Sequence, residues 1–167
     1  MQNKLIKVLV IADTHGQNQR WIELKNYHNP DVIIHAGDHM TTKQFMDQNA
    51  TFWVAGNNDS IGNEIEIFQL GQINFVLMHG HQAPRDNLKK WYQLLVLKAQ
   101  QYPCDVLIFG HSHIEYTNKI NKIQLINPGS LQLPRNQTNT PSYCTFIVNK
   151  DELTDLTIHY YQASKVS

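Results

Sequence analysis

The 167-residue sequence predicts one α/β domain in which two packed β-sheets carry helices on their outer sides. Three observations indicate this fold class. Short apolar runs alternate with segments of helical spacing in the first third of the chain, which is typical of parallel strands joined by crossover helices. An alternating segment and a turn follow, and they predict an antiparallel hairpin. Further strand-like runs come later, so about nine strands and three or four helices are expected.

The first third of the chain supplies the expected parallel strands. Residues 8–12, 32–36 and 52–55 are short apolar runs that end at glycine or polar residues, as buried strands do where they lead into loops. Residues 20–27 and 42–48 have the apolar spacing of helices and connect these strands. In a sheet built in this way, the carboxyl ends of the strands lie along one edge, where ligands bind.

The rest of the chain predicts a second group of strands and the longest helix. In chain order we expect a hairpin of residues 64–67 and 73–78, a helix over residues 87–101, and strands over residues 105–109, 123–126, 143–148 and 156–160. A turn near residues 149–152 joins the last two strands. There is no internal repeat, low-complexity tract or linker, so residues 1–167 are expected to form a single domain.

The charge balance limits the classes of partner. Fourteen Lys and Arg residues balance fourteen Asp and Glu residues, so the formal net charge is zero. A protein that coats nucleic acid or a membrane surface would carry a basic excess, so neither an extended nucleic acid nor a membrane is expected as a partner. A nucleotide-sized substrate stays open, because bound metal ions would add positive charge that the composition does not count.

Cysteine usage and the N-terminal segment favour a cytoplasmic location. Cys104 and Cys144 lack the short spacing of a metal or redox site, and both are expected to be small buried side chains. The first residues lack the apolar run and the cleavage site of a signal peptide. No segment approaches the ~18 apolar residues that a membrane-spanning helix needs. We therefore expect a cytoplasmic protein.

Five of the predicted strands end in clusters of side chains that can bind metal ions. These are Asp13-Thr14-His15, Gly37-Asp38, Gly56-Asn57-Asn58-Asp59, His79-Gly80-His81 and Gly110-His111-Ser112-His113. Each cluster alone also fits a turn, a helix cap or surface histidines. Because strand ends converge at one edge, the five together favour a metal site. Carboxylate and amide oxygens mixed with imidazole nitrogens suit manganese, iron or zinc better than calcium.

This series of motifs resembles the calcineurin-like metallophosphoesterases, and within them the small bacterial and archaeal phosphodiesterases. The resemblance covers residues 13–130, and the closing strands fit the second sheet of that family. It implies a four-layer α/β/β/α sandwich of two mixed sheets. It also implies a hydrolase, and a homodimer or higher homo-oligomer stays open, because homodimers are common in the small branch of the family.

The resemblance implies a centre of two divalent cations. Manganese is the first expectation, with iron, zinc or nickel as alternatives. One cation would be held by Asp13, His15, Asp38 and His113, and the other by Asp38, Asn57, His79 and His111. Asp38 would bridge the two, because a shared carboxylate offsets the repulsion between cations ~3.5–4 Å apart.

The resemblance implies an enzyme that hydrolyses a small phosphate ester, and a phosphodiester is the first expectation. The attacking group would be a hydroxide that bridges the two cations. Two alternatives stay open. One is a hydrolase of diadenosine polyphosphates or another nucleotide. The other is a non-catalytic scaffold with the same fold, as in the retromer subunit that serves as a protein-binding platform. The complete set of ligand positions favours an enzyme over the scaffold.

Three residues are expected to act in catalysis: Asp38 as the bridging ligand, Asn58 and His81. Many larger relatives carry a histidine at the position of Asn58, where it assists the leaving group. Asn58 can donate a hydrogen bond but cannot act as a general acid near neutral pH. His81 is expected beside the site, either in contact with phosphate or in a structural hydrogen bond. Arg85, Arg135 and Ser130 are lesser candidates for contact with the substrate.

Overall fold

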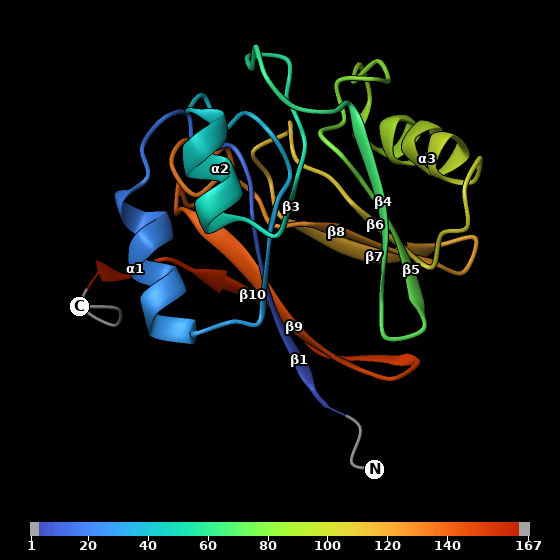
Figure 1. Ribbon diagram of the computed structural model, residues 1–167. Coiled ribbons are helices and arrows are strands. Elements are labelled where there is room, and N and C mark those ends of the chain that lie inside the picture. The colour runs from blue at the N-terminus through green and yellow to red at the C-terminus, as the bar shows by residue number, and fades with distance from the viewer. Residues whose placement is uncertain (1–3, 164–167) are drawn as a thin grey trace.

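The computed structural model describes residues 4–163, and in this part of the chain ten strands and three helices form two packed sheets with helices outside them (Figure 1). The first sheet has the strand order β10-β9-β1-β2-β3. Its strands are β1 (Ile6–Ile11), β2 (Val32–His35), β3 (Phe52–Trp53), β9 (Ser142–Asn149) and β10 (Glu152–Tyr160). β1, β2 and β3 are parallel, whereas β9 and β10 are antiparallel to their neighbours.

The second sheet is also mixed and has the strand order β4-β5-β6-β8-β7. Its strands are β4 (Ile65–Leu70), β5 (Ile73–Met78), β6 (Val106–Ile108), β7 (Tyr116–Ile120) and β8 (Ile123–Asn127). The three central strands β5, β6 and β8 are parallel, and the antiparallel strands β4 and β7 form the two edges. Parallel strands in both sheets therefore bring several carboxyl ends together.

Alternate residues of the central strands face different layers, which explains the four-layer arrangement. Val8 and Val10 of β1 pack between the two sheets, in one cluster with Phe75 of β5. Leu9 and Ile11, the residues between and after them, pack on the outer side against the helices α1 (Gln19–His28) and α2 (Lys43–Asn49). The sheet is therefore buried on both faces, as its continuous apolar strands predict.

The third helix, α3 (Leu88–Ala99), covers the outer side of the second sheet. Its buried residues Trp91, Leu95 and Val96 form one cluster with Leu107 and Phe109. In Figure 1, α1 and α2 lie on one side of the sheets and α3 lies on the other. No helix within residues 4–163 is long and apolar enough to cross a membrane.

The predicted fold class, two mixed sheets with outer helices, is confirmed, and most elements lie within a few residues of their expected bounds. One strand was not predicted. β7 (Tyr116–Ile120) is an edge strand with mainly exposed polar residues, so it lacks the apolar pattern that indicates a strand. Asn121 and Lys122, both with positive φ, form the tight turn into β8. Positive φ at both central residues is the geometry of a hairpin turn.

Two leucines on α3 test how the helix stabilises the fold. Leu95 is fully buried against the second sheet, whereas 60% of the Leu97 surface is exposed. We expect Leu95→Ala to lower the free energy of unfolding by about 2–5 kcal/mol, because it removes buried methyl groups and leaves a cavity. Leu97→Ala is expected to change it by less than ~0.5 kcal/mol. Urea denaturation followed by circular dichroism measures both, and equal losses would contradict the described packing.

Candidate metal centre

The loops that follow the parallel strands are tied to one another by backbone hydrogen bonds. The Asp13 amide, directly after β1, donates to the Gly37 carbonyl after β2 at 3.0 Å. The His15 amide donates to the Asp38 carbonyl, also at 3.0 Å. Within the second sheet, the Gly110 amide donates to the His79 carbonyl at 2.9 Å. The ring of His79 connects the two sheets, since its Nδ1 lies 2.7 Å from the Ala36 carbonyl after β2. The predicted ligand clusters therefore share one edge of the molecule, although up to about 100 residues separate them along the chain.

Five of the seven predicted metal ligands have a left-handed backbone conformation. Their φ angles are 53° for Asp13, 48° for His15, 54° for Asp38, 72° for His111 and 60° for His113. Residues other than glycine rarely adopt this conformation, which costs of order 1–3 kcal/mol each and is concentrated at functional sites. Here it accompanies the sharp bends at which each strand ends, and these bends turn the side chains toward a common centre.

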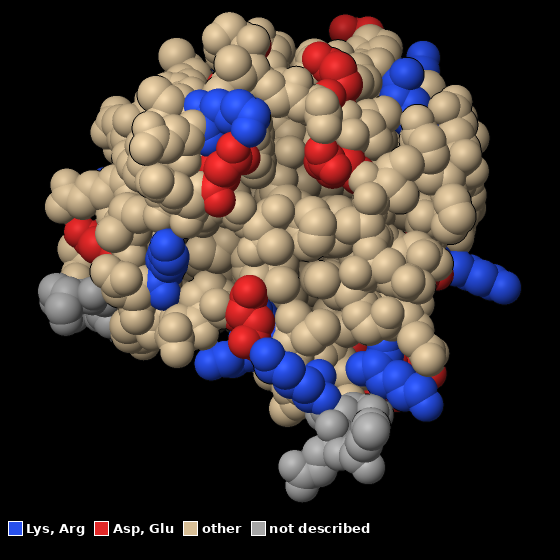
Figure 2. All heavy atoms as spheres, in the orientation of Figure 1, with Lys and Arg blue, Asp and Glu red and all other residues tan. Residues whose placement is uncertain are grey.

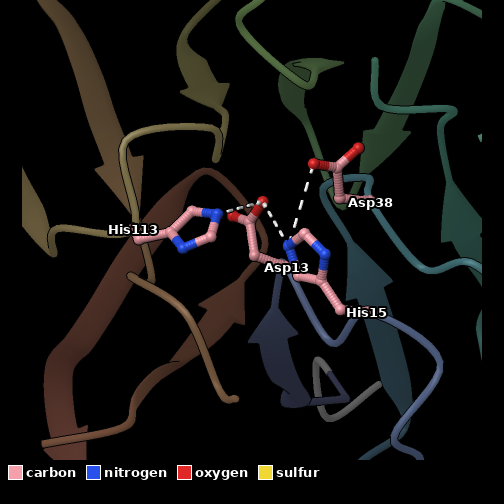
Figure 3. Close-up of side chains that lie close together, drawn as sticks. All are labelled: Asp13, His15, Asp38 and His113. Carbon is pink, nitrogen blue, oxygen red and sulfur yellow. Dashed lines mark ion pairs between the residues drawn. The ribbon is translucent and has the colours of Figure 1, made fainter. Parts of the chain in front are cut away.

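Four of the side chains lie close enough together to share one cation (Figure 3). One ligand atom from each of Asp13, His15, Asp38 and His113 lies within 4.8 Å of all the others. The shortest contact joins His113 Nε2 to Asp13 Oδ1 at 3.2 Å, and His15 Nε2 lies 3.9 Å from a carboxylate oxygen of each aspartate. These four residues are the ligand set that the sequence assigns to the first cation.

His79 and His111 extend the cluster on a second side. His79 Nε2 lies 3.4 Å from Asp38 Oδ2 and 3.7 Å from Asp13 Oδ1. The ring of His111 is centred 5.1 Å from the ring of His79, and the backbone amide of His111 donates to Asp13 Oδ2 at 3.2 Å. Six of the seven predicted ligands are therefore neighbours around the two aspartates.

Two of the histidines are held in the tautomer that binds metals. His79 Nδ1 lies 2.7 Å from the Ala36 carbonyl, and His113 Nδ1 lies 2.6 Å from the Leu133 carbonyl. A carbonyl oxygen can only accept, so each Nδ1 carries a proton and donates it. In the neutral ring, Nε2 then has a free lone pair that faces the carboxylates. This arrangement is typical of histidines that ligate a metal through Nε2.

Several polar atoms of the centre are buried without a hydrogen-bond partner. Asp13 Oδ1, His15 Nε2 and His79 Nε2 are in this state, and Asp13 and His79 are fully buried. An unsatisfied buried polar group costs about 1–3 kcal/mol, and more when it is charged. A cation between these atoms would satisfy all of them at once. The residues present therefore fit divalent cations held by oxygen and imidazole nitrogen.

The protonation states follow from the same contacts. Burial acts to raise the pKa of Asp38, but the nearby ring of His79 and the hydrogen bonds from Asn58 outweigh it and hold this pKa below its usual range. Burial acts to lower the pKa of His79, and the two aspartates outweigh it, so its pKa is raised. Burial, His79 and Arg85 lower the pKa of His111 to about 4. Metal binding should therefore be pH-dependent, because a cation competes with protons for these donor atoms.

The two asparagines of the third cluster lie differently. The backbone amide of Asn58 donates to Asp38 Oδ1, and its side-chain amide donates to Asp38 Oδ2, both at 2.9 Å. Asn57 is exposed, and its side chain makes no hydrogen bond within residues 4–163. Asn58 is therefore the asparagine that orients the carboxylate of Asp38, and the amide of Asn57 stays free.

His81 and Ser130 border the centre in different ways. His81 Nε2 lies 3.1 Å from Glu64 Oε2, and its ring is centred 5.6 Å from the ring of His79. His81 Nδ1 is buried without a partner. Ser130 Oγ donates to the Asp13 carbonyl at 2.8 Å, so it supports the loop beneath the centre. His35 is a buried, hydrogen-bonded core residue, since its two ring nitrogens contact Thr14 and Gly37.

The comparisons with known proteins agree on one family. Residues 6–151 match the Calcineurin-like phosphoesterase superfamily domain. The chain belongs to this superfamily. It is 99% identical over 163 residues to a probable metallophosphoesterase of Mycoplasma genitalium, covering 98% of this chain and 100% of that protein. A probable metallophosphoesterase of Mycoplasma pneumoniae is 60% identical over 93% of this chain and 98% of its own. The chain is thus a metallophosphoesterase.

More distant matches include a phosphodiesterase and solved structures of the same fold. A phosphodiesterase of Methanocaldococcus jannaschii is 24% identical over 74% of this chain and 83% of its own. A predicted phosphoesterase from Streptococcus pneumoniae superimposes with a TM-score of 0.75 at 20% identity, over 95% of this chain and 99% of that one. Vacuolar Protein Sorting 29 from Cryptosporidium parvum gives 0.71 at 18% identity, over 95% and 98%. At these identities the two structures show the shared fold alone.

Asp59 has a role in this calcineurin-like phosphoesterase that the sequence did not predict. Its carboxylate accepts hydrogen bonds from the backbone amides of Gly56, His39 and Met40, at 2.7, 3.2 and 2.7 Å. It therefore fastens the loop that carries Asn57 and Asn58 to the loop that carries Asp38. The available signal was its place three residues after Gly56, where an aspartate often accepts from the backbone of a turn.

The glycines beside the candidate ligands lie where the backbone of one loop comes very close to a side chain of another loop. A Cβ on Gly56 would lie 2.1 Å from Asp38 Oδ1, and a Cβ on Gly37 would lie 2.7 Å from His79 Nδ1. On Gly110 it would lie 2.9 Å from Asp13 Oδ2. Each loop is thus packed directly against a ligand of a neighbouring loop, and only glycine leaves the room.

Gly56→Ala tests this packing. The added Cβ has to displace Asp38, so we expect a lower melting temperature and a fall of at least ~10-fold in the affinity for manganese, measured by calorimetry. Gly71→Ala is the matched control. A Cβ on Gly71 would lie 2.3 Å from the Lys150 carbonyl, in the hairpin turn between β4 and β5 and away from the metal ligands. It should lower the melting temperature while the folded protein keeps its manganese affinity. Unchanged affinity in Gly56→Ala would contradict the described contact.

Proposed function

We propose that this metallophosphoesterase is a phosphodiesterase that hydrolyses a small phosphate ester at a centre of two divalent cations, with manganese as the preferred metal. The observation that carries the proposal is the convergence of Asp13, Asp38 and the Nε2 atoms of His79 and His113, where no Lys or Arg of residues 4–163 pairs with either carboxylate. Buried carboxylates surrounded by imidazole lone pairs need cations as their counter-charge.

We assign the ligands in two groups that share Asp38. Asp13, His15, Asp38 and His113 would hold the first cation, and Asp38, Asn57, His79 and His111 the second. The first group is supported by its mutual distances within 4.8 Å. The second is supported by the contact of His79 with Asp38 and by the position of His111 beside His79. Asp38 suits the shared position because two hydrogen bonds from Asn58 fix its carboxylate.

Two bound divalent cations would supply Lewis-acid polarisation of the phosphoryl oxygens and a water of lowered pKa. The protein side chains orient this chemistry. His79 and His113 are fixed through Nδ1, and Asn58 fixes Asp38. Asn58 does not protonate a leaving group, since an amide is no acid near neutral pH. The enzyme should therefore favour esters whose leaving group needs little protonation, and His81 is the candidate for a further contact with phosphate.

A small substrate fits the charge distribution better than an extended nucleic acid. The formal net charge is zero. Figure 2 shows acidic and basic side chains interspersed on one face, without a continuous basic stripe. A nucleotide or dinucleoside polyphosphate is a second candidate substrate, and Arg85 beside His111 favours it. The scaffold function is a weaker alternative, because a protein-binding platform does not require the full ligand set.

Hydrolysis of bis(p-nitrophenyl) phosphate tests the proposed reaction. We expect manganese-dependent release of p-nitrophenolate that a chelator abolishes and added manganese restores. Asp38→Asn keeps the shape of the side chain but removes the shared charge, so kcat/KM should fall by at least ~10²-fold. Asp151→Asn, in the exposed turn between β9 and β10, is the control and should keep full activity. If folded wild-type protein hydrolyses no phosphate ester with manganese, iron, zinc or nickel, the scaffold alternative replaces this proposal.

The two adjacent asparagines give a test of the ligand assignment. Asn57→Ala should reduce the manganese bound at saturation from two ions to one per chain, because it removes a proposed ligand of the second cation. Asn58→Ala should keep two ions but bind them ~10–100-fold more weakly, as is usual when a residue that orients a ligand is lost. Calorimetry and elemental analysis measure both quantities. The reverse result, with one ion lost only in Asn58→Ala, would exchange the two roles.

A further inference from the structure

Arg85 is a cation beside the metal centre that has no acidic partner. It lies in the loop between β5 and α3, is half-buried, and donates from one guanidinium nitrogen to the His111 carbonyl at 2.5 Å. Within residues 4–163 this is its one side-chain hydrogen bond, and no carboxylate forms an ion pair with it. A guanidinium has five N–H donors, so most of them remain available.

The loop that carries Arg85 is anchored on both sides. Trp91 Nε1 donates to the Gly80 carbonyl at 2.9 Å, and Ala83 is buried in the cluster under α3. Beyond Arg85, the side chain of Asn87 accepts from the amide of Lys90 and caps the first turn of α3. These contacts on both sides of Arg85 limit the positions that its side chain can reach. The fold of the loop therefore holds Arg85 close to His111.

The guanidinium stands at the outer side of the His111 half of the centre. The imidazole of His111 faces His79, whereas Arg85 binds the main chain of His111. The hydrogen bond to His111 places the positive charge of Arg85 next to this half of the centre. This charge is nevertheless not paired with Asp13 or Asp38, whose contacts are with histidines and Asn58. A group bound by Arg85 would therefore lie beside the metal-bound phosphate.

The charge balance indicates what that group is. Asp13 and Asp38 carry two negative charges, so two divalent cations leave the centre with a net charge of about +2. A phosphodiester carries one negative charge and is already attracted. The half-buried guanidinium of Arg85 has a carbonyl partner but no acidic one, so an anion that bound to it would gain both an opposite charge and free N–H donors. Arginine is also the side chain whose fork of donors matches phosphate oxygens.

We propose that Arg85 binds a second phosphate group of the substrate, so that the natural substrate carries at least two phosphates, as a nucleoside polyphosphate does. This inference rests on the proposed function and names its substrate class. The phosphate whose ester bond is cleaved would bind at the metal centre. The second phosphate would bind next to His111, along the loop between β5 and α3.

The other two arginines provide contrasts. Arg135 is exposed, and only its backbone amide contacts the centre, through the His113 carbonyl at 3.0 Å. Arg20 is engaged elsewhere, with a hydrogen bond to the Leu131 carbonyl and a position 4.9 Å above the ring of Tyr161. Arg135→Gln is thus the matched control, since it removes the same charge near the site without removing a guanidinium that touches it.

Binding of ADP and AMP to the manganese-loaded protein tests the proposal, because the two ligands differ by one phosphate. Calorimetry at a fixed free manganese concentration should give wild type an affinity for ADP ~10–100-fold higher than for AMP. Arg85→Gln should remove most of this preference, and Arg85→Lys should restore part of it. In Arg85→Gln, the kcat/KM for bis(p-nitrophenyl) phosphate, which has one phosphate, should fall by a smaller factor than the affinity for ADP.

Three outcomes would overturn the proposal. In the first, wild type binds ADP no more tightly than AMP. In the second, Arg135→Gln weakens the preference for ADP as much as Arg85→Gln does. In the third, Arg85→Gln lowers AMP binding and diester hydrolysis as much as it lowers ADP binding. The last would mean that Arg85 only positions His111 or binds the cleaved phosphate. Melting temperature and manganese content confirm that each variant is folded and loaded. Failure of the proposed function itself is distinct, because wild type would then hydrolyse no diester while the ADP and AMP affinities remain measurable.

Discussion

The repulsion between buried acceptors around Asp13 and Asp38 is the constraint on which the rest of the site depends. Two carboxylates are removed from water, and the Nε2 atoms of His79 and His113 turn toward them because their Nδ1 atoms are committed to backbone carbonyls. Such an arrangement is unfavourable by itself, since it concentrates negative charge and lone pairs at low dielectric. It becomes favourable when divalent cations occupy the centre, so part of the metal affinity is prepared in the fold.

The two sheets hold this unfavourable arrangement in place. Hydrogen bonds between the strand-end loops, the carboxylate of Asp59 and the close contact of Gly56 with Asp38 all resist relaxation of the site. The left-handed backbone at five ligands adds strain that the packed apolar layers compensate. A rigid scaffold with strained loops at its edge is a general way to fix ligands within the narrow tolerances of metal chemistry.

The same fold supports catalysis and protein binding, so the function of this chain has to be argued from its site. The donor atoms around Asp13 and Asp38 favour a metallophosphoesterase over a platform. Asn58 and Arg85 then narrow the reaction. Asn58 orients the carboxylate of Asp38, and its amide cannot act as an acid near neutral pH. Arg85 places a positive charge beside His111, which favours a substrate with more than one phosphate.

Sequence alone predicted the fold class, which depends on local patterns, and it pointed to candidate metal ligands through the motifs at the strand ends. Apolar periodicity marks the buried strands, and Asp13, Asp38 and His79 stand directly where those strands end. The edge strand β7 was not predicted, since its exposed polar residues carry no such pattern. Only the tertiary structure decided that Asn58 rather than Asn57 holds Asp38, that Asp59 joins two loops, and that Arg85 reaches His111. These contacts join residues about 20 to 30 positions apart, and their geometry is set by how the layers pack rather than by any local preference of the chain.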